Sequence, residues 1–242
     1  GLGRKIKMKL SDKITIVVPC KNEENYIAHL LMHLRQQSIG DTRIIIADCS
    51  TDKTREVIQI MKGELNVEVI DGGPVSIAKN NGAKLVTTPY ILFIDADVRF
   101  FSPTAIYDAV QCIHQENLDL VTLSPKNYGT EWRASIIFRL FSVFNKVMTQ
   151  FTPFAIGAFF LTRRSVFEAF GGFPNKYDTS EDYILSKQYE AKKFKIVNHY
   201  FGQDERRFKK LGYLGMLWYM IVNFFNRHNL QHFEKSKVNY WD

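Results

Sequence analysis

The chain of 242 residues lacks the features that mark several broad classes of protein. Its three cysteines, Cys20, Cys49 and Cys112, are widely spaced and form no Cys-x-x-Cys, which argues against a disulfide framework or a zinc site. Neither a Gly-x-Gly-x-x-Gly nor a Gly-Lys-Ser/Thr motif occurs, so dinucleotide-binding and P-loop folds lack their signatures. No apolar run reaches the roughly 18–20 residues of a membrane-spanning helix, and no signal peptide is recognised. These absences favour a globular protein of the reducing cytoplasm.

Apolar residues make up 45% of the chain and aromatic residues 14%, enough for a sizeable core in one large domain. The net charge of +7 is uneven, because residues 192–242 hold ten Lys or Arg and only four Asp or Glu. Such a basic block indicates an anionic partner (phosphate, nucleic acid or anionic lipid), or else a solvated basic surface. Nucleic acid is not favoured, since no nucleic-acid-binding signature accompanies the charge.

The first half of the chain alternates between short apolar runs and helical spacing. Strands are predicted at 14–19, 43–48, 67–70 and 90–94. Helices are predicted after residue 22, near Asp52 and from about Val75, with Asn22 capping the first and Glu23 and Glu24 in its first turn. This alternation predicts an α/β fold with a mostly parallel, doubly wound central sheet flanked by helices.

The second half is less regular. A helix is predicted at 103–115, strands at 119–123, 158–161 and 194–197, a turn at 171–174, and a helix that opens at Glu181. The aromatic segment 132–154 carries a helical stripe made of Ile136, Leu140, Val143, Phe144 and Val147. This segment and the apolar run 211–225 each fit either a helix in a membrane interface or a buried core helix or dimer contact.

Two carboxylates, Asp95 and Asp97, follow the buried strand predicted at 90–94. Open α/β sheets bind ligands just beyond the carboxyl ends of their strands. A hard cation such as Mg²⁺ or Mn²⁺ prefers oxygen ligands and bridges to phosphates, so it would account for two acids at this position. The alternative is a strand end with two solvated turn residues.

Acids also follow the second predicted strand, at Asp48 and Asp52, and precede a late helix, at Glu181 and Asp182. One such position is usually a turn or a helix cap. A parallel sheet would bring all three positions towards one edge, which favours a single shared site.

These motifs, in this order, resemble the inverting GT-A glycosyltransferases of glycosyltransferase family two. The resemblance covers roughly residues 14–210. It rests on Val17-Val18-Pro19-Cys20-Lys21-Asn22-Glu23, Asp48-Cys49-Ser50-Thr51-Asp52, Ala78-Lys79-Asn80-Asn81-Gly82, Asp95-Ala96-Asp97, Gly171-Gly172-Phe173 and Glu181-Asp182. It implies a GT-A (Rossmann-like) domain at 1–210, with a nucleotide-sugar half at about 14–100, an acceptor half at about 101–210, and a helical, aromatic-rich tail at 211–242.

The resemblance also implies roles for individual residues. The pocket for the nucleotide base and ribose would be lined by Pro19, Asn22, Glu23, Asp48 and Asp52. Lys79, where the family commonly has Arg, would approach the nucleotide or the diphosphate. Asp95 and Asp97 match the acid-x-acid motif that holds Mn²⁺ or Mg²⁺, with Asp97 the direct ligand and Asp95 beside the nucleotide. Asp182 resembles the general base, with Glu181 its neighbour.

Three further residues have two interpretations each. His199 is a further candidate metal ligand, although a lone histidine beside a strand is more often packed or solvated. Arg206 and Arg207 resemble a pair of arginines that would contact the diphosphate or the acceptor, or they belong to an exposed basic surface. The sequence departs from the family pattern at Ala47, where a second acid is common, and at Lys79.

The function implied is a metal-dependent transfer of sugar from a nucleoside-diphosphate sugar to a hydroxyl of a glycan or lipid-linked acceptor, in cell-envelope glycan synthesis. The expected location is the cytoplasm, at the inner face of the membrane, with peripheral contact to anionic lipid through residues 206–225. Two alternatives stay open at this stage: a sugar nucleotidyltransferase, and a non-catalytic module that binds an anionic ligand.

Overall fold

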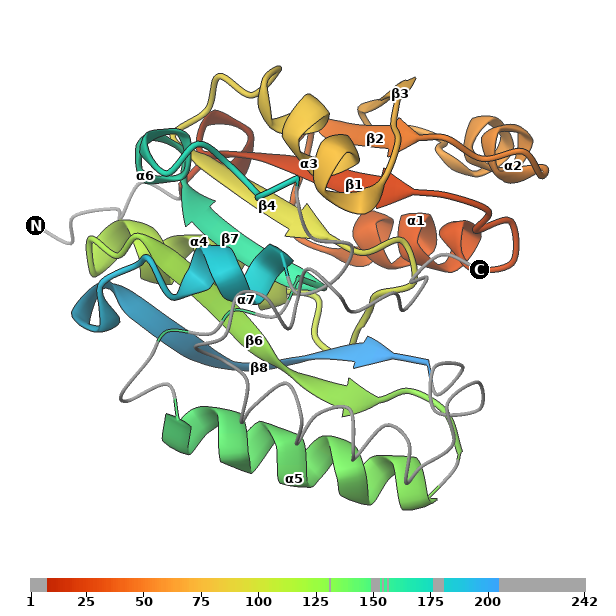
Figure 1. Cartoon of the computed structure of the whole chain (residues 1–242). Helices are drawn as coiled ribbons and strands as arrows, with labels where there is room; N and C mark the ends of the chain where they lie inside the picture. The colour runs from red at the N-terminus through yellow and green to blue at the C-terminus, as the bar shows by residue number, and fades with distance from the viewer. Residues whose placement is uncertain are drawn as a thin grey trace, which may run out of the picture.

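The computed structural model describes residues 8–130, 132–148, 153, 155, 157–175 and 181–204. Within this part, one eight-stranded sheet runs in the order β3-β2-β1-β4-β7-β6-β8-β5, with helices on both faces (Figure 1). The predicted α/β class and the helix-flanked sheet are therefore confirmed. The predicted tail at 211–242, and Arg206 and Arg207, lie outside the described residues.

Four neighbouring strands of the first half run parallel to one another, as the βαβ pattern predicts. They are β3 (Val67–Asp71), β2 (Ile44–Asp48), β1 (Ile14–Cys20) and β4 (Tyr90–Ile94). The connecting helices are α1 (Ile27–Gln36), α2 (Thr54–Met61) and α3 (Val75–Ala83). The register sets Cys20 beside Asp48 and Asp48 beside Asp71, so these strands end together at one edge of the sheet.

The second half extends the sheet with mixed directions. Strand β7 (Phe159–Arg163) is antiparallel to β4 and to β6 (Leu120–Asn127), whereas β8 (Phe194–Gln203) is parallel to β6. The short β5 (Arg99–Phe100) pairs antiparallel with β8. The sheet is thus parallel on the nucleotide-sugar side expected from the sequence and mixed beyond β4.

Two apolar layers enclose the sheet, and β4 contributes to both. Leu92 and Ile94 belong to the layer shared with α1 and α4 (Ala105–Gln115). Ile91 and Phe93 belong to the opposite layer, which takes in residues of α3, α6 (Arg164–Ala169) and α7 (Glu181–Ser186). Alternate residues of a strand point to opposite faces, so burial of both faces explains why 90–94 is apolar throughout.

The rings of Phe93, Phe160, Phe167 and Phe173 pack together in the second layer, with centroids 4.9 to 6.1 Å apart. This aromatic cluster brings the Gly171-Gly172-Phe173 turn against β4 and α3. Both glycines have positive φ, at 80° and 78°, a conformation that glycine adopts without strain.

The start of the first helix was predicted wrongly. Helix α1 begins at Ile27 with no acid in its first turn, and its N-cap residue, Tyr26, makes no side-chain cap. Asn22 instead has a φ of 53°, in the left-handed region that asparagine tolerates better than most residues. Its side chain bonds to the neighbouring loop, so it is not available to a helix four residues further on.

Other differences concern short or polar elements. The two-residue β5 and the six-residue α6 were not predicted, because neither is long enough to show a period. Strand β6 continues past the predicted end at Leu123, through Pro125 to Asn127. A register shift at residues 122–124 separates this polar extension from the apolar part of the strand, and the extension pairs with Tyr200–Gln203 of β8.

The predicted helical stripe is confirmed as one face of α5 (Trp132–Met148), but that face is exposed. The residues of α5 that are buried are Ala134 and Phe138. The core-helix interpretation therefore fails for the stripe, because the helix packs through its other side. No helix among the described residues is long and apolar enough to cross a bilayer.

Close approach of α3 to β1 depends on Gly82. A Cβ at this position would lie closer than 3.0 Å to a methyl carbon of Val17. Lys79 lies one turn earlier on the same helix. The close spacing between α3 and β1 therefore also helps to bury the Lys79 side chain.

We expect Gly82→Ala to lower the free energy of unfolding by about 1–3 kcal/mol, because the clash outweighs the better helix propensity of alanine. Urea denaturation would measure the change. In a Val17→Ala background, which removes the clashing methyls, the added cost of Gly82→Ala should largely disappear. Equal costs in both backgrounds would contradict the packing interpretation.

Candidate active site

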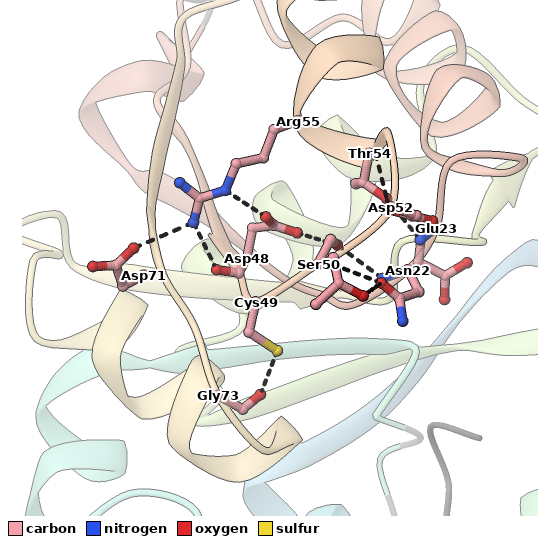
Figure 2. A network of polar contacts seen from close by, with 11 residues as sticks. Asn22, Glu23, Asp48, Cys49, Ser50, Asp52, Thr54, Arg55, Asp71 and Gly73 are labelled. Atoms are coloured by element: carbon pink, nitrogen blue, oxygen red, sulfur yellow. Dashed lines mark hydrogen bonds and ion pairs between the residues drawn. The ribbon is translucent and has the colours of Figure 1, made fainter.

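Two loops at the carboxyl ends of β1 and β2 are joined by a network of polar contacts (Figure 2). The backbone amide of Thr51 donates to Asn22 Oδ1 at 2.9 Å, and the amide of Asn22 donates to Ser50 Oγ at 2.8 Å. The amide of Glu23 donates to Thr54 Oγ1 at 2.9 Å. Asn22 and Glu23, both predicted for the nucleotide pocket, are thereby held beside the loop that begins at Asp48.

Asp48 is the buried centre of this network. Its Oδ2 accepts from Arg55 Nε at 2.7 Å, and its Oδ1 accepts from the hydroxyl of Ser50 (Figure 2). Arg55 Nη2 also donates to the carbonyl of Asp48 at 3.0 Å and to Asp71 Oδ1 at 3.2 Å. The Asp48 side chain is fully buried, whereas that of Arg55 is half exposed, so Arg55 supplies the countercharge from the solvent side.

Arg55 and Asp71 are not among the site residues predicted from the sequence. The sequence did contain a signal for Arg55, because a basic residue in the first turn of a helix follows the loop that begins at the buried Asp48. The register that sets Asp71 beside Asp48 is a property of the sheet, and only the structure shows it.

Asp52 holds the start of α2. Its Oδ1 accepts from the amide of Thr54 at 3.0 Å, and its Oδ2 accepts from the amide of Glu24 at 3.4 Å. Burial raises the pKa of Asp52, but the hydrogen bonds from Thr54 and Glu24 outweigh burial and leave it below its usual value. Asp52 is thus an ionised residue whose hydrogen bonds stabilise the start of α2 beside the predicted pocket.

Two cysteines border the network. Cys49 Sγ donates to the carbonyl of Gly73 at 3.4 Å (Figure 2). Burial, and then the nearby Asp48 and Glu23 charges, raise the pKa of the Cys20 thiol far above its usual range. Cys20 is therefore a packing residue and no nucleophile.

A second cluster joins the two halves of the chain through a buried ion pair. Lys79 Nζ, on α3, lies 2.8 Å from Glu181 Oε1, at the start of α7, and the two side chains are 1% and 9% exposed. Burial lowers the pKa of Lys79, but the charges of Glu181, Asp95 and Asp182 raise it above its usual value overall. Lys79 is therefore a permanent buried cation among three carboxylates.

Asp182 lies next to this pair and is held by two backbone amides. Its Oδ2 accepts from the amide of Gly157 at 2.6 Å, and its Oδ1 accepts from the amide of Tyr183 at 2.8 Å. Burial and the charge of Glu181 raise the pKa of Asp182 to about 6, against the opposing effect of Lys79. Such a carboxylate is largely ionised at neutral pH yet readily takes up a proton.

Gly157 permits this arrangement. A Cβ at Gly157 would lie 2.9 Å from Asp182 Oδ2 and 3.1 Å from Lys79 Nζ, so a side chain would separate its amide from the carboxylate. Gly157 is not among the site residues predicted from the sequence, because an isolated glycine before a strand carries no signal of its own.

The structure brings Lys79, Asp95, Glu181 and Asp182 together. Asp97, two residues after Asp95 in the loop that follows β4, is 5% exposed. Pro19 lies in β1 beside Ala47 of β2. Among the described residues, no three His, Cys, Asp or Glu side chains are grouped so as to hold a metal ion.

His199 lies elsewhere. Its Nε2 is 2.7 Å from Asp108 Oδ2 on α4, which covers the opposite face of the sheet from α3 and α7. The ligand role predicted for His199 gains no support from this position.

Two of the proteins that share sequence with this chain are glycosyltransferases from staphylococci. The poly(ribitol-phosphate) beta-N-acetylglucosaminyltransferase TarS of Staphylococcus aureus is 29% identical over 122 residues, covering 47% of this chain and 21% of TarS. The 4,4'-diaponeurosporenoate glycosyltransferase of Staphylococcus haemolyticus is 23% identical over 193 residues, covering 77% of this chain and 49% of that protein. The chain thus matches half or less of the length of these relatives.

Solved structures share the fold. The complex of S. aureus TarS 1–349 with UDP-GlcNAc superposes with a TM-score of 0.62 at 20% identity, covering 79% of this chain and 58% of that one. The mannosyltransferase PcManGT of Pyrobaculum calidifontis, in complex with GDP-Man and Mn²⁺, superposes with a TM-score of 0.63 at 18% identity, covering 79% and 56%. The fold is therefore GT-A-like.

The family model for glycosyl transferase family 2 matches residues 15–171. This range runs from β1 through the turn at Gly171 and takes in both loops of the Asp48 network, Lys79 and the Asp95-Ala96-Asp97 motif. The chain therefore belongs to glycosyl transferase family 2.

Proposed function

We propose that this family 2 glycosyltransferase moves a sugar from a nucleoside-diphosphate sugar to an acceptor hydroxyl, with inversion at the anomeric carbon and Asp182 as general base. The observation that carries the proposal is the partly buried Asp182 carboxylate, fixed by two backbone amides and with its pKa raised to about 6. A base in that range matches the task of removing a hydroxyl proton near neutral pH.

The proton transfer requires free capacity on Asp182. Each carboxylate oxygen can accept two hydrogen bonds, and the amides of Gly157 and Tyr183 use one on each. The remaining lone pairs can accept the acceptor hydroxyl, while the two amides keep the carboxylate from rotating. As the hydroxyl oxygen attacks the anomeric carbon, the bond from that carbon to the diphosphate oxygen breaks and the nucleoside diphosphate leaves. Asp182 takes the hydroxyl proton, and no covalent enzyme intermediate is needed.

Glu181 and Lys79 tune this base in opposite directions. The negative charge of Glu181 raises the pKa of Asp182, and the positive charge of Lys79 lowers it. Lys79 also has Asp95 among the charges that act on it, so one buried cation connects the proposed base with the acid-x-acid motif. In this role Lys79 positions carboxylates, which differs from the direct approach to a diphosphate implied by the family resemblance.

The donor is proposed to lie over the Asp48 network. Asn22, Glu23 and Asp48 come from two loops that are tied to each other, so a base and ribose bound there would meet a preorganised surface. The solved relatives TarS and PcManGT bind UDP-GlcNAc and GDP-Man, respectively, which supports a nucleotide-sugar donor and leaves the base and the sugar open.

A divalent cation fits the donor set of the Asp95-Ala96-Asp97 motif. Two carboxylates follow the end of β4, and Mg²⁺ commonly binds one or two carboxylates together with phosphate oxygens and water. Asp97 is proposed as the direct ligand, with Asp95 beside it, and a relative of the same fold was crystallised with Mn²⁺. When bound, Mn²⁺ or Mg²⁺ would stabilise the negative charge that grows on the departing diphosphate.

The acceptor is proposed to be a glycan or lipid-linked molecule of the cell envelope. The names of the two relatives include poly(ribitol-phosphate) and 4,4'-diaponeurosporenoate, which supports an acceptor of this kind. The contacts expected from Arg206 and Arg207, and from residues 206–225 with the inner face of the membrane, concern residues outside the described part and stay predictions.

We expect a nucleoside diphosphate (UDP, GDP or dTDP) to raise the melting temperature when Mn²⁺ or Mg²⁺ is present, and Asp97→Ala to abolish the gain. Differential scanning fluorimetry with and without the cation would measure it. Asp41→Ala, at an exposed acid before β2, is the matched control and should keep the full shift. The absence of a shift with all three nucleotides would count heavily against the proposal, and release of pyrophosphate from a nucleoside triphosphate would favour a nucleotidyltransferase.

The rate should depend on pH through Asp182. Because a protonated carboxyl cannot accept the hydroxyl proton, kcat/KM should fall about tenfold per pH unit below an apparent pKa near 6. Asp182→Asn should lower kcat by about 10²–10⁴-fold. Glu181→Gln removes a charge that raises the pKa, so its acidic limb should move to lower pH. An Asp182→Asn enzyme with the wild-type rate would eliminate Asp182 as the base.

The buried ion pair should also contribute to stability. Lys79→Met leaves the buried Glu181 carboxylate without its partner, which should cost about 3–5 kcal/mol in urea denaturation. The double variant Lys79→Met/Glu181→Gln should regain part of that loss, because the buried Glu181 charge that lost its partner is removed as well. Lys84→Met, at an exposed lysine just after α3, is the control and should have little effect. Similar costs for Lys79→Met and Lys84→Met would refute the central place given to Lys79.

A further inference from the structure

Helix α5 is attached to the sheet through one side only. It lies along the outside of the molecule next to β6 (Figure 1). Ala134 and Phe138 are its buried residues, and Ser142 Oγ donates to the carbonyl of Pro125 at 3.0 Å. These contacts fix which face of the helix points inward.

The opposite side of α5 carries a second apolar face. Ile136 and Phe138 are two residues apart, which places them about 200° apart around the helix axis. The exposed fractions of the outer residues are Trp132 65%, Ile136 48%, Leu140 61%, Val143 58%, Phe144 44% and Val147 52%. A helix on the surface of a soluble domain normally presents polar residues on this side. A continuous exposed stripe of this kind marks an interaction surface.

The charges of α5 identify the chemistry of the partner. Arg133, Arg139 and Lys146 are exposed, and the helix sequence contains no Asp or Glu. Arg133 and Arg139 each lie three residues from Ile136, which places them about 60° to either side of the stripe. The guanidinium of Arg133 also stacks over the Trp132 ring, 5.4 Å from its centroid. The outer face is thus an apolar stripe bordered by cations.

We propose that this outer face of α5 docks on an anionic lipid surface, with the stripe at the boundary between headgroups and acyl chains and the cations against phosphates. A second copy of the chain would set cations against cations, which disfavours a symmetric dimer through this face. A bilayer interface suits both properties, since it accepts Trp and aliphatic side chains beside long basic ones. With 17 residues, α5 extends about 25 Å, enough to lie in the plane of a membrane.

The inference does not rest on the proposed catalysis. None of the residues of the outer face belongs to the candidate active site. Helix α5 is also a different element from residues 206–225, for which the sequence predicts contact with anionic lipid, whereas for segment 132–154 the sequence left a membrane interface and a core or dimer contact both open. If both proposals hold, the enzyme would act on acceptors that are presented at a lipid surface.

Co-sedimentation of the full chain with vesicles tests the proposal. Wild-type protein should bind vesicles of phosphatidylcholine mixed with phosphatidylglycerol more tightly than vesicles of phosphatidylcholine alone, and salt should weaken the binding. Leu140→Gln/Val143→Gln should weaken it by about tenfold or more, because two apolar side chains no longer enter the interface. Ile60→Gln, at a residue of α2 that is 79% exposed, is the matched control and should bind as wild type does.

A second double variant tests the contribution of the basic residues that border the stripe. Arg133→Gln/Arg139→Gln should weaken binding to the anionic vesicles by about fivefold per charge and leave binding to neutral vesicles unchanged. Thermal shifts with nucleoside diphosphate, measured on the same variants, should stay at the wild-type value. That readout separates a failure of the membrane proposal from a failure of the catalytic one.

Three results would overturn the proposal. One is that anionic vesicles do not bind the wild-type protein, or bind the variant Leu140→Gln/Val143→Gln as tightly as the wild type. Another is a wild-type dimer in light scattering that this variant converts to a monomer, which would make the face a contact between copies. The third is a large fall in melting temperature for the same variant, which would show that the face is covered within the folded chain.

Discussion

The ion pair between Lys79 and Glu181 is the interaction on which the rest of the site depends. It joins residues 102 positions apart, one on a helix of the parallel half and one at the start of a helix that follows the antiparallel strand β7. A buried lysine is tolerated only when its charge is balanced, and here three carboxylates balance it. Because Asp95 and Asp182 both lie within its influence, the cation that holds the two halves together also sets the electrostatics in which a base could work.

The sheet explains why the other groups gather where they do. Parallel strands β1, β2 and β3 end at the same edge, so Asn22, Asp48 and Asp71 become neighbours although they are far apart in sequence. Buried Asp48 is balanced by a half-exposed Arg55, and buried Glu181, next to Asp182, is balanced by a fully buried Lys79. The first arrangement leaves a carboxylate tied into a rigid loop pair. In the second arrangement, the partly buried Asp182 has a raised pKa, because burial and the charge of Glu181 outweigh the effect of Lys79.

The hydrophobic pattern of the sequence predicted the structure correctly where one physical effect dominated. Strand β4 is apolar at every position because both of its faces are covered, and its length and flanking residues were enough to locate it. Pattern failed where two effects competed. Asn22 has the chemistry of a helix cap, yet it adopts a left-handed turn and bonds to the next loop. The stripe on α5 has the period of a core face, yet the core is on the other side, where Ala134 and Phe138 lie.

The sequence by itself determined the α/β class, the parallel first half, and a set of acids in an order that resembles one enzyme family. These follow from hydrophobic periodicity and from motif spacing, which are local along the chain. Only the tertiary structure decided that Lys79 pairs with Glu181, that Gly157 donates to Asp182, that Arg55 neutralises Asp48, and that His199 lies with Asp108 on the other face. Each of these contacts depends on strand order, register and helix depth, and those are set by packing of the whole sheet, which no local stretch of sequence encodes.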